Sequence, residues 1–202
     1  MKRSKWYFFL SAIIFAFLLL GCQGETPTSS EKFDVLAKFG NGNGNGNGGG
    51  SGYELSEEER DGLIHMRIEE KLARDVYIMM GDLWNHKVFI NIQLSEQKHM
   101  DAVLRLLVKY NVTDPLITDS VGVFPDLQFQ QLYDQFILQG NQSLQEALLV
   151  GKTIEELDIA DLEYQLTFVD NPDIIRVYQN LKSASENHLA AFLKYLNVPI
   201  AE

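Results

Sequence analysis

The chain of 202 residues has one cysteine, and its 17 lysine and arginine residues are outnumbered by 28 aspartate and glutamate residues. A single cysteine cannot form a disulfide within the chain, and no pair of thiolates is available for a metal. The formal charge of −11 disfavours nucleic acid and anionic lipid as electrostatic partners. Strand patterns are almost absent after residue 52, which argues against a β-sheet domain.

The chain also lacks an apolar run long enough to span a membrane. The run at residues 6–20 has about fifteen residues, whereas a membrane-spanning helix needs roughly twenty. It follows a basic start and precedes Leu19-Leu20-Gly21-Cys22, which resembles the lipobox of bacterial lipoproteins. We therefore predict a signal peptide over residues 1–21, cleaved before Cys22, with a retained signal anchor as the alternative.

Residues 22–52 are predicted to be a lipid-anchored flexible linker. The stretch 40–52 repeats Gly-Asn pairs, a composition that cannot build a core and behaves as a flexible coil. Removing residues 1–21 takes away three basic residues, so the formal charge changes from −11 to −14. The expected location is the cell envelope, exported from the cytoplasm and anchored to a membrane through Cys22. Gln23 at the next position favours the outer membrane.

Residues 53–202 match the size of one domain and carry the apolar periodicity of helices. Capping boxes, turn residues and this periodicity predict helices at 56–84, 89–110, 126–139, 143–169 and 171–197. Two short turns make two antiparallel hairpins, and a long crossover that contains the short helix joins them. This pattern predicts an all-α, ferritin-like four-helix bundle, with a more irregular helical array as the alternative.

Polar residues interrupt the apolar face of the long helices. Glu70 lies in the middle of the apolar face of the first helix, and Glu96 with His99 forms a Glu-x-x-His pair on the second. His188 takes a central apolar position on the last helix. A carboxylate on each of two helices, with Glu-x-x-His on each of the others, is the ligand set of di-iron and di-manganese bundles. Any one of these residues alone is more often a satisfied core residue, so their coincidence in one layer carries the prediction.

The third long helix departs from a clean pattern. Periodicity favours Glu155 over Glu156 as the inward residue, and Gly151 would leave space beside the site. Three residues before His188, where the pattern requires glutamate, the chain has Ser185. Asp158, one turn from Glu155, could supply the missing carboxylate.

Two segments resemble the first-helix and second-helix motifs of rubrerythrin-like proteins: Glu70–Tyr77 and Ser95–Met100. Together with Val150–Leu162 and Ser185–Leu189, they make the chain resemble a ferritin-like family catalogued as domain of unknown function 2202. The resemblance implies an iron site, or a manganese site, with five ligands: Glu70, Glu96, His99, Glu155 and His188.

The resemblance further implies a dinuclear iron centre that reacts with peroxide or dioxygen. The chain has no Cys-x-x-Cys pair for a rubredoxin iron, so an external electron donor would be needed. The alternative is a non-enzymatic envelope lipoprotein with a degenerate site, which Ser185 favours and the Glu96/His99 pair opposes. The expected partners are the membrane and that donor; a homodimer stays open.

Replacing Cys22 with serine should leave an unlipidated precursor, because the thiol is the acceptor of the lipid. Palmitate labelling and detergent partitioning of wild type and Cys22→Ser measure this directly. Unchanged labelling in the variant would show that the anchor assignment is wrong.

Overall fold

The computed structural model describes residues 54–196, and this part of the chain contains five helices and no strand. The predicted signal peptide, Cys22 and the linker lie outside the described residues. The helices are α2 (Glu57–Trp84), α3 (Lys87–Lys109), α4 (Leu127–Gly140), α5 (Leu144–Leu166) and α6 (Pro172–Leu196). The prediction of an all-helical domain is confirmed.

The helix ends follow from local side-chain chemistry. Ser56 accepts a hydrogen bond from the Glu59 amide and Glu59 accepts one from the Ser56 amide, which is the predicted capping box of α2. Asn85 ends α2 in the left-handed conformation, with φ of 47°. The His86 ring then accepts a hydrogen bond from the Val88 amide, so α3 begins two residues earlier than predicted. α5 ends at Leu166, three residues before its predicted end.

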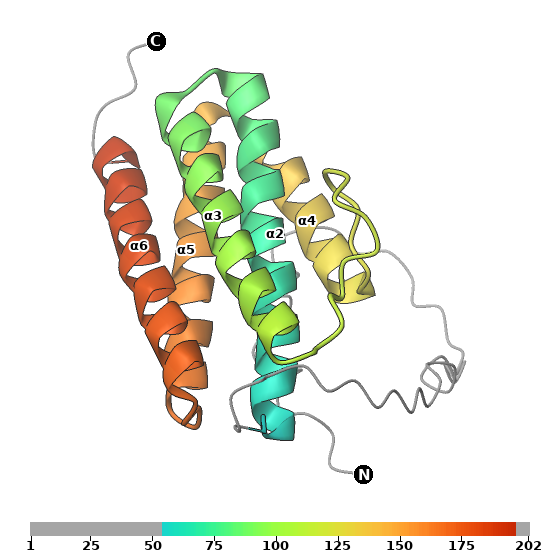
Figure 1. Ribbon diagram of the computed structural model, residues 1–202. Helices are drawn as coiled ribbons and strands as arrows, with labels where there is room; N and C mark the ends of the chain where they lie inside the picture. The colour runs from blue at the N-terminus through green and yellow to red at the C-terminus, as the bar shows by residue number, and fades with distance from the viewer. Residues whose placement is uncertain (1–53, 197–202) are drawn as a thin grey trace, which may run out of the picture. The chain divides into compact units, whose positions relative to one another are not determined.

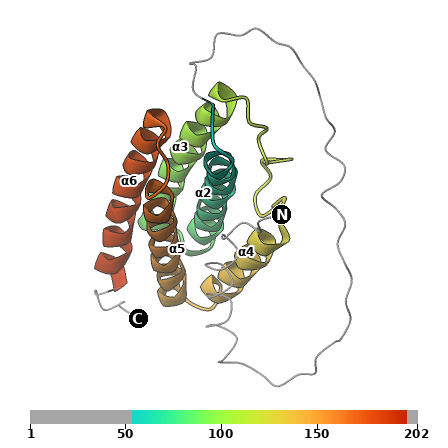
Figure 2. The ribbon, with the colours of Figure 1, turned by 90° about the horizontal axis from the view of Figure 1, so that it is seen from below.

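The four long helices contact one another in a closed ring. α2 packs against α3, α3 against α6, α6 against α5, and α5 against α2. The α2–α3 and α5–α6 turns lie at opposite ends of the domain (Figure 1). α4 packs against α2 and α5, outside the ring, as the view from below shows (Figure 2). Each long helix therefore turns one face toward a shared interior.

None of the described helices combines the length and the hydropathy required to cross a membrane.

Apolar side chains from all four long helices fill one part of this interior. The core cluster includes Leu63, Met66, Val103, Leu107, Leu162, Ile174 and Tyr178, each fully or almost fully buried. Burying an aliphatic side chain stabilises the fold by roughly 1.5–3 kcal/mol relative to leaving it exposed. This core fixes the mutual positions of the four helices on which the polar residues lie.

A buried charge network holds the crossover against α2. The ammonium group of Lys71 is fully buried, bonds to Asp75 and donates to the Ser120 carbonyl at 2.8 Å. Arg74 donates to the other Asp75 oxygen at 2.9 Å, and the Gly122 amide donates to Asp75 at 2.9 Å. Asp75 therefore links Lys71 and Arg74 of α2 to the backbone of the crossover at Gly122.

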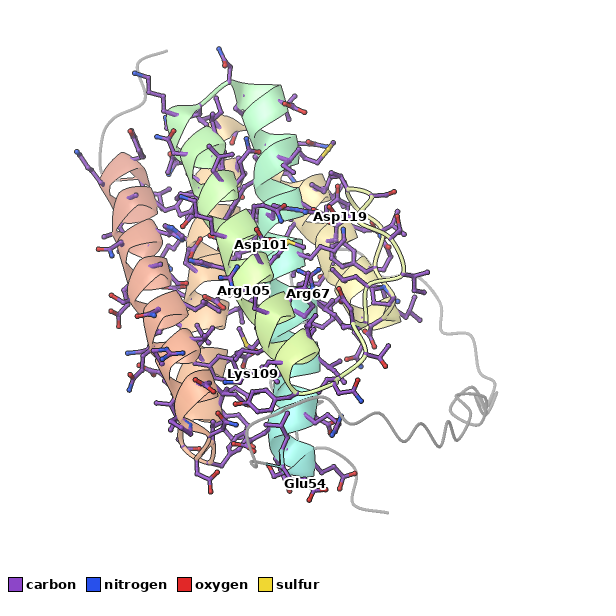
Figure 3. The ribbon with its side chains drawn as sticks, in the orientation of Figure 1. Glu54, Arg67, Asp101, Arg105, Lys109 and Asp119 are labelled. Atoms are coloured by element: carbon purple, nitrogen blue, oxygen red, sulfur yellow. The ribbon has the colours of Figure 1, made fainter. Side chains whose placement is uncertain are left out.

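Two further arginine contacts extend this attachment. Arg67 pairs with Asp114 at 3.0 Å, and Arg74 pairs with Asp119 at 2.8 Å. Figure 3 labels Arg67 and Asp119 on the side where α2 meets the crossover, and Asp101, Arg105 and Lys109 along the exposed face of α3. The basic face of α2 thus binds the crossover.

Replacing Asp75 with asparagine should destabilise the domain by about 3 kcal/mol, because it leaves the buried Lys71 and Arg74 without full compensation. The matched control is Glu156→Gln, which breaks the exposed Lys152–Glu156 pair and should cost less than about 1 kcal/mol. Urea unfolding of both variants measures the difference. Equal costs would contradict the role of the buried network.

Candidate metal centre

Three side chains from α2 and α3 converge in the interior. His99 Nδ1 lies 3.2 Å from Glu70 Oε2 and 2.7 Å from Glu96 Oε2. Glu70 is 1% exposed, Glu96 2% and His99 7%. Glu96 and His99 are one turn apart on α3, so they share its inward face, and α2 supplies Glu70 from the neighbouring helix.

A second group of three uses the other oxygen of Glu96. His188 Nδ1, on α6, lies 2.9 Å from Glu96 Oε1 and 3.4 Å from Glu155 Oε2, on α5. In each group the potential ligand atoms lie within 4.8 Å of one another. The rings of His99 and His188 stack with centroids 5.6 Å apart. Glu96 therefore lies between two imidazoles and belongs to both groups, as a bridging carboxylate would.

Tyr77 orients the second group from the α2 side. Its hydroxyl donates to Glu155 Oε1 at 2.7 Å, and its ring packs against Phe192 and Phe89 with centroid distances of 5.4 and 6.1 Å. All three aromatic rings are fully buried. Tyr77 therefore contacts a candidate ligand, Glu155, directly. The aromatic cluster closes this end of the site to water.

Two carboxylate oxygens of the cluster have no hydrogen-bond partner within residues 54–196. They are Glu70 Oε1 and Asp158 Oδ1, whereas Glu96 Oε1 and His188 Nδ1 lie 2.9 Å from each other. An unsatisfied buried polar atom costs roughly 1–3 kcal/mol, and more when it is charged. Carboxylate oxygens and an imidazole nitrogen are the donors that iron and manganese accept. The residues present therefore fit a metal.

The electrostatics of the cluster also favour a cation. Burial by itself raises the pKa of Glu96, but the imidazoles of His188 and His99 lower it to about 2. Burial would lower the pKa of His99, yet the carboxylates raise it to about 11, and they raise the pKa of His188 to about 9. Burial raises the pKa of Glu70 to about 8 and that of Glu155 to about 7. Positive charge beside these carboxylates is what stabilises their ionised form.

Asp158 lies next to the two groups and contacts Ser185. The Ser185 hydroxyl, fully buried on α6, donates to Asp158 Oδ2. Burial, followed by the charge of Glu70, raises the pKa of Asp158 well above its usual value. The serine that replaces the expected glutamate therefore bonds a carboxylate from α5, and one Asp158 oxygen is left without a partner.

The structure distinguishes Glu155 from its neighbour Glu156. Glu155 is buried, whereas Glu156 is exposed and pairs with Lys152 at 2.7 Å. Glu186 is exposed and bonds to Lys182 on the outside of α6, so it is turned away from the interior. All six predicted ligand positions are buried or nearly so: Glu70, Glu96, His99, Glu155, Asp158 and His188.

Arg67 and Arg74 bind the crossover, and Glu70 contacts His99. One expectation about a neighbouring residue is wrong. Gly151 does not leave open space, because the ring of Phe192 fills it.

Sequence reasoning also missed a third group, which contains His65. His65 contacts Glu69 and Asp161. The one available signal was the i, i+4 spacing of His65 and Glu69 on α2.

Known proteins match the sequence of this domain. The family model described as "Uncharacterized protein domain (DUF2202)" matches residues 59–199. Uncharacterized protein MJ0754 of Methanocaldococcus jannaschii is 53% identical over 143 residues, which cover 71% of this chain and 77% of that protein. The crystal structure of hypothetical protein MJ0754 is similar, with a TM-score of 0.72 and 51% identity over 74% of this chain and 86% of that one.

Replacing Gly151 with alanine should destabilise the domain by about 1–3 kcal/mol, because the new Cβ would lie 2.3 Å from the buried Phe192 ring. Gly81→Ala is the matched control. There the nearest atom is an Ile90 carbon at 3.5 Å, so alanine should be neutral or stabilise α2 by up to about 1 kcal/mol. Thermal unfolding compares the two. A Gly151 variant as stable as the Gly81 variant would refute close packing here.

Proposed function

The chain belongs to the DUF2202 family, and we propose that its domain is a ferritin-like four-helix bundle that binds iron or manganese at up to two adjacent positions. Glu70 and His99 would hold one ion. Glu155 and His188 would hold the other, and Glu96 would bridge the two. The observation that carries the proposal is that the two oxygens of Glu96 face two different histidines.

The arrangement of the helices supports the ferritin-like assignment. The four long helices form a closed ring of contacts, and the two short turns lie at opposite ends. The crossover with α4 runs along the outside of the ring, where α4 contacts α2 and α5. A long crossover between two hairpins is the connection that distinguishes ferritin-like bundles from simple up-down bundles.

The ligand sets of the two positions would differ from those of a symmetric centre. Ser185 cannot act as the bridging glutamate, and its hydroxyl is used by Asp158. The Asp158 oxygen that makes no hydrogen bond could supply the missing carboxylate ligand from α5. The charge of Glu70 lies close enough to raise the pKa of Asp158. We therefore expect the two positions to bind metal with unequal affinity.

The reaction we propose is redox chemistry with peroxide or dioxygen, for which a bound iron pair would supply the electrons. Around it the chain's own residues would set the environment. Tyr77 would hold Glu155 in place through its 2.7 Å hydrogen bond, and the Phe89 and Phe192 rings would exclude water. An external protein would have to donate electrons, because the chain has one cysteine only.

We also propose that the domain acts in the cell envelope, tethered through acylated Cys22. The support is the lipobox-like segment and the Gly/Asn-rich stretch that follows it. A membrane tether suits a domain that meets peroxide or dioxygen outside the cytoplasm, and it argues against a closed storage shell, which lipidated subunits would build with difficulty.

A second candidate is an envelope lipoprotein that binds metal without turnover or serves as an interaction module. The observation that favours it is Ser185, which leaves the fourth helix without its second carboxylate. Peroxide consumption by the reduced, iron-loaded protein separates the candidates: turnover supports the enzyme, and stable metal binding without turnover supports the binder.

Metal binding should be tested with Glu155→Gln against Glu156→Gln, which are neighbours on α5 with opposite burial. We expect Glu155→Gln to lose about one ion per chain by elemental analysis, and Glu156→Gln to bind as wild type does. Chelator should lower the melting temperature of wild type, since a ligand at a hundred times its Kd stabilises the fold by about 2.7 kcal/mol. Equal metal content in the two variants, or melting that ignores iron and manganese, would reject the metal centre.

A further inference from the structure

A third group of ligand-type side chains lies between α2 and α5 and shares no residue with the central site. His65 and Glu69 are one turn apart on α2, and Asp161 comes from α5. His65 Nε2 lies 3.1 Å from Asp161 Oδ2 and 3.4 Å from Glu69 Oε2. The three potential ligand atoms all lie within 4.8 Å of one another.

The chemistry of this group suits a divalent metal ion. One imidazole nitrogen and two carboxylate oxygens form a mixed donor set of the kind that Zn²⁺, Mn²⁺ and Fe²⁺ accept. Three protein ligands leave a coordination position for water, and the side chains of His65, Glu69 and Asp161 are 9–11% exposed, so solvent can reach it. The central carboxylates, at 1–2% exposed, are more deeply buried.

One carboxylate oxygen in the group makes no hydrogen bond within the described part of the chain. Glu69 is 7% exposed, and its Oε2, the atom that faces His65, makes no hydrogen bond. Within residues 54–196, no lysine or arginine forms an ion pair with Glu69 or Asp161. This buried carboxylate oxygen faces an imidazole and receives no hydrogen bond. A cation bound between the two groups would compensate the cost of its burial.

The surroundings hold the group in place and favour positive charge. The Phe129 ring on α4 packs against His65 with centroids 5.3 Å apart, which restricts the imidazole. Burial would lower the pKa of His65, but Asp161 and Glu69 raise it to about 9. The negative charge of the two carboxylates favours a proton on the imidazole, and the same charge would attract a metal ion.

We propose that His65, Glu69 and Asp161 bind one divalent transition-metal ion, in addition to the ions of the central site. The site joins α2 of the first hairpin to α5 of the second. The competing reading is an ion pair between protonated His65 and the two carboxylates, which would bind no metal.

The test uses the full-length chain in detergent, stripped of metal and then loaded with Zn²⁺ alone. Elemental analysis after desalting counts the bound ions. We expect His65→Gln and Asp161→Asn each to bind one ion fewer than wild type. His86→Gln is the matched control, because His86 caps α3 outside all three groups, and it should bind the wild-type number. Circular dichroism and melting of the metal-free variants verify that they fold.

The double variant His99→Ala/His188→Ala separates this proposal from the central site. It should retain one Zn²⁺, which a further His65→Gln change should remove. If the central site binds nothing, wild type and the double variant should both hold one ion, and only the His65 change should abolish it. The proposal is overturned if His65→Gln and Asp161→Asn bind as much Zn²⁺ as wild type, or if the double variant binds none.

Discussion

A carboxylate removed from water is costly unless positive charge or hydrogen-bond donors lie beside it, and this constraint governs the interior of the domain. Glu96 meets it by lying between two imidazoles, and its pKa falls to about 2 as a result. Glu70 and Glu155 are less well compensated, and burial raises the pKa of each. The cluster thus contains more carboxylate than cationic groups, an imbalance that the proposed metal ions would offset.

The same constraint explains why α2 carries charge on two sides. One side supplies Glu70 to the interior, and the other supplies Lys71 and Arg74, which are compensated by Asp75 and by the crossover backbone. Apolar side chains of α4 pack on the bundle, whereas charged hydrogen bonds attach the part of the crossover that precedes α4. Phe124, whose ring lies 4.6 Å from the Lys71 ammonium, adds a cation–π contact.

The helices and the inward residues could be predicted because a period of 3.6 residues specifies which face of a helix is apolar. Glu96 and Glu155 were identified in this way, and the structure buries both. Asp161, the partner of His65 on α5, could not be identified, since periodicity assigns a face but not the neighbouring helix or its axial register. The contact of Phe192 with Gly151 was not predicted for the same reason, because it depends on the axial register of α5 against α6.

The two central groups differ in the sequence distance between their members. Glu70, Glu96 and His99 all lie on α2 and α3, which two residues connect, whereas the second group needs α5 and α6 as well. Contacts within one hairpin cost less loop entropy than contacts across the crossover, so they can form earlier in folding. The first hairpin can therefore present a complete trio of donors before the second hairpin docks. A metal ion that arrives early would act as a template on which the remaining helices assemble, and one that arrives late would have to enter a closed interior.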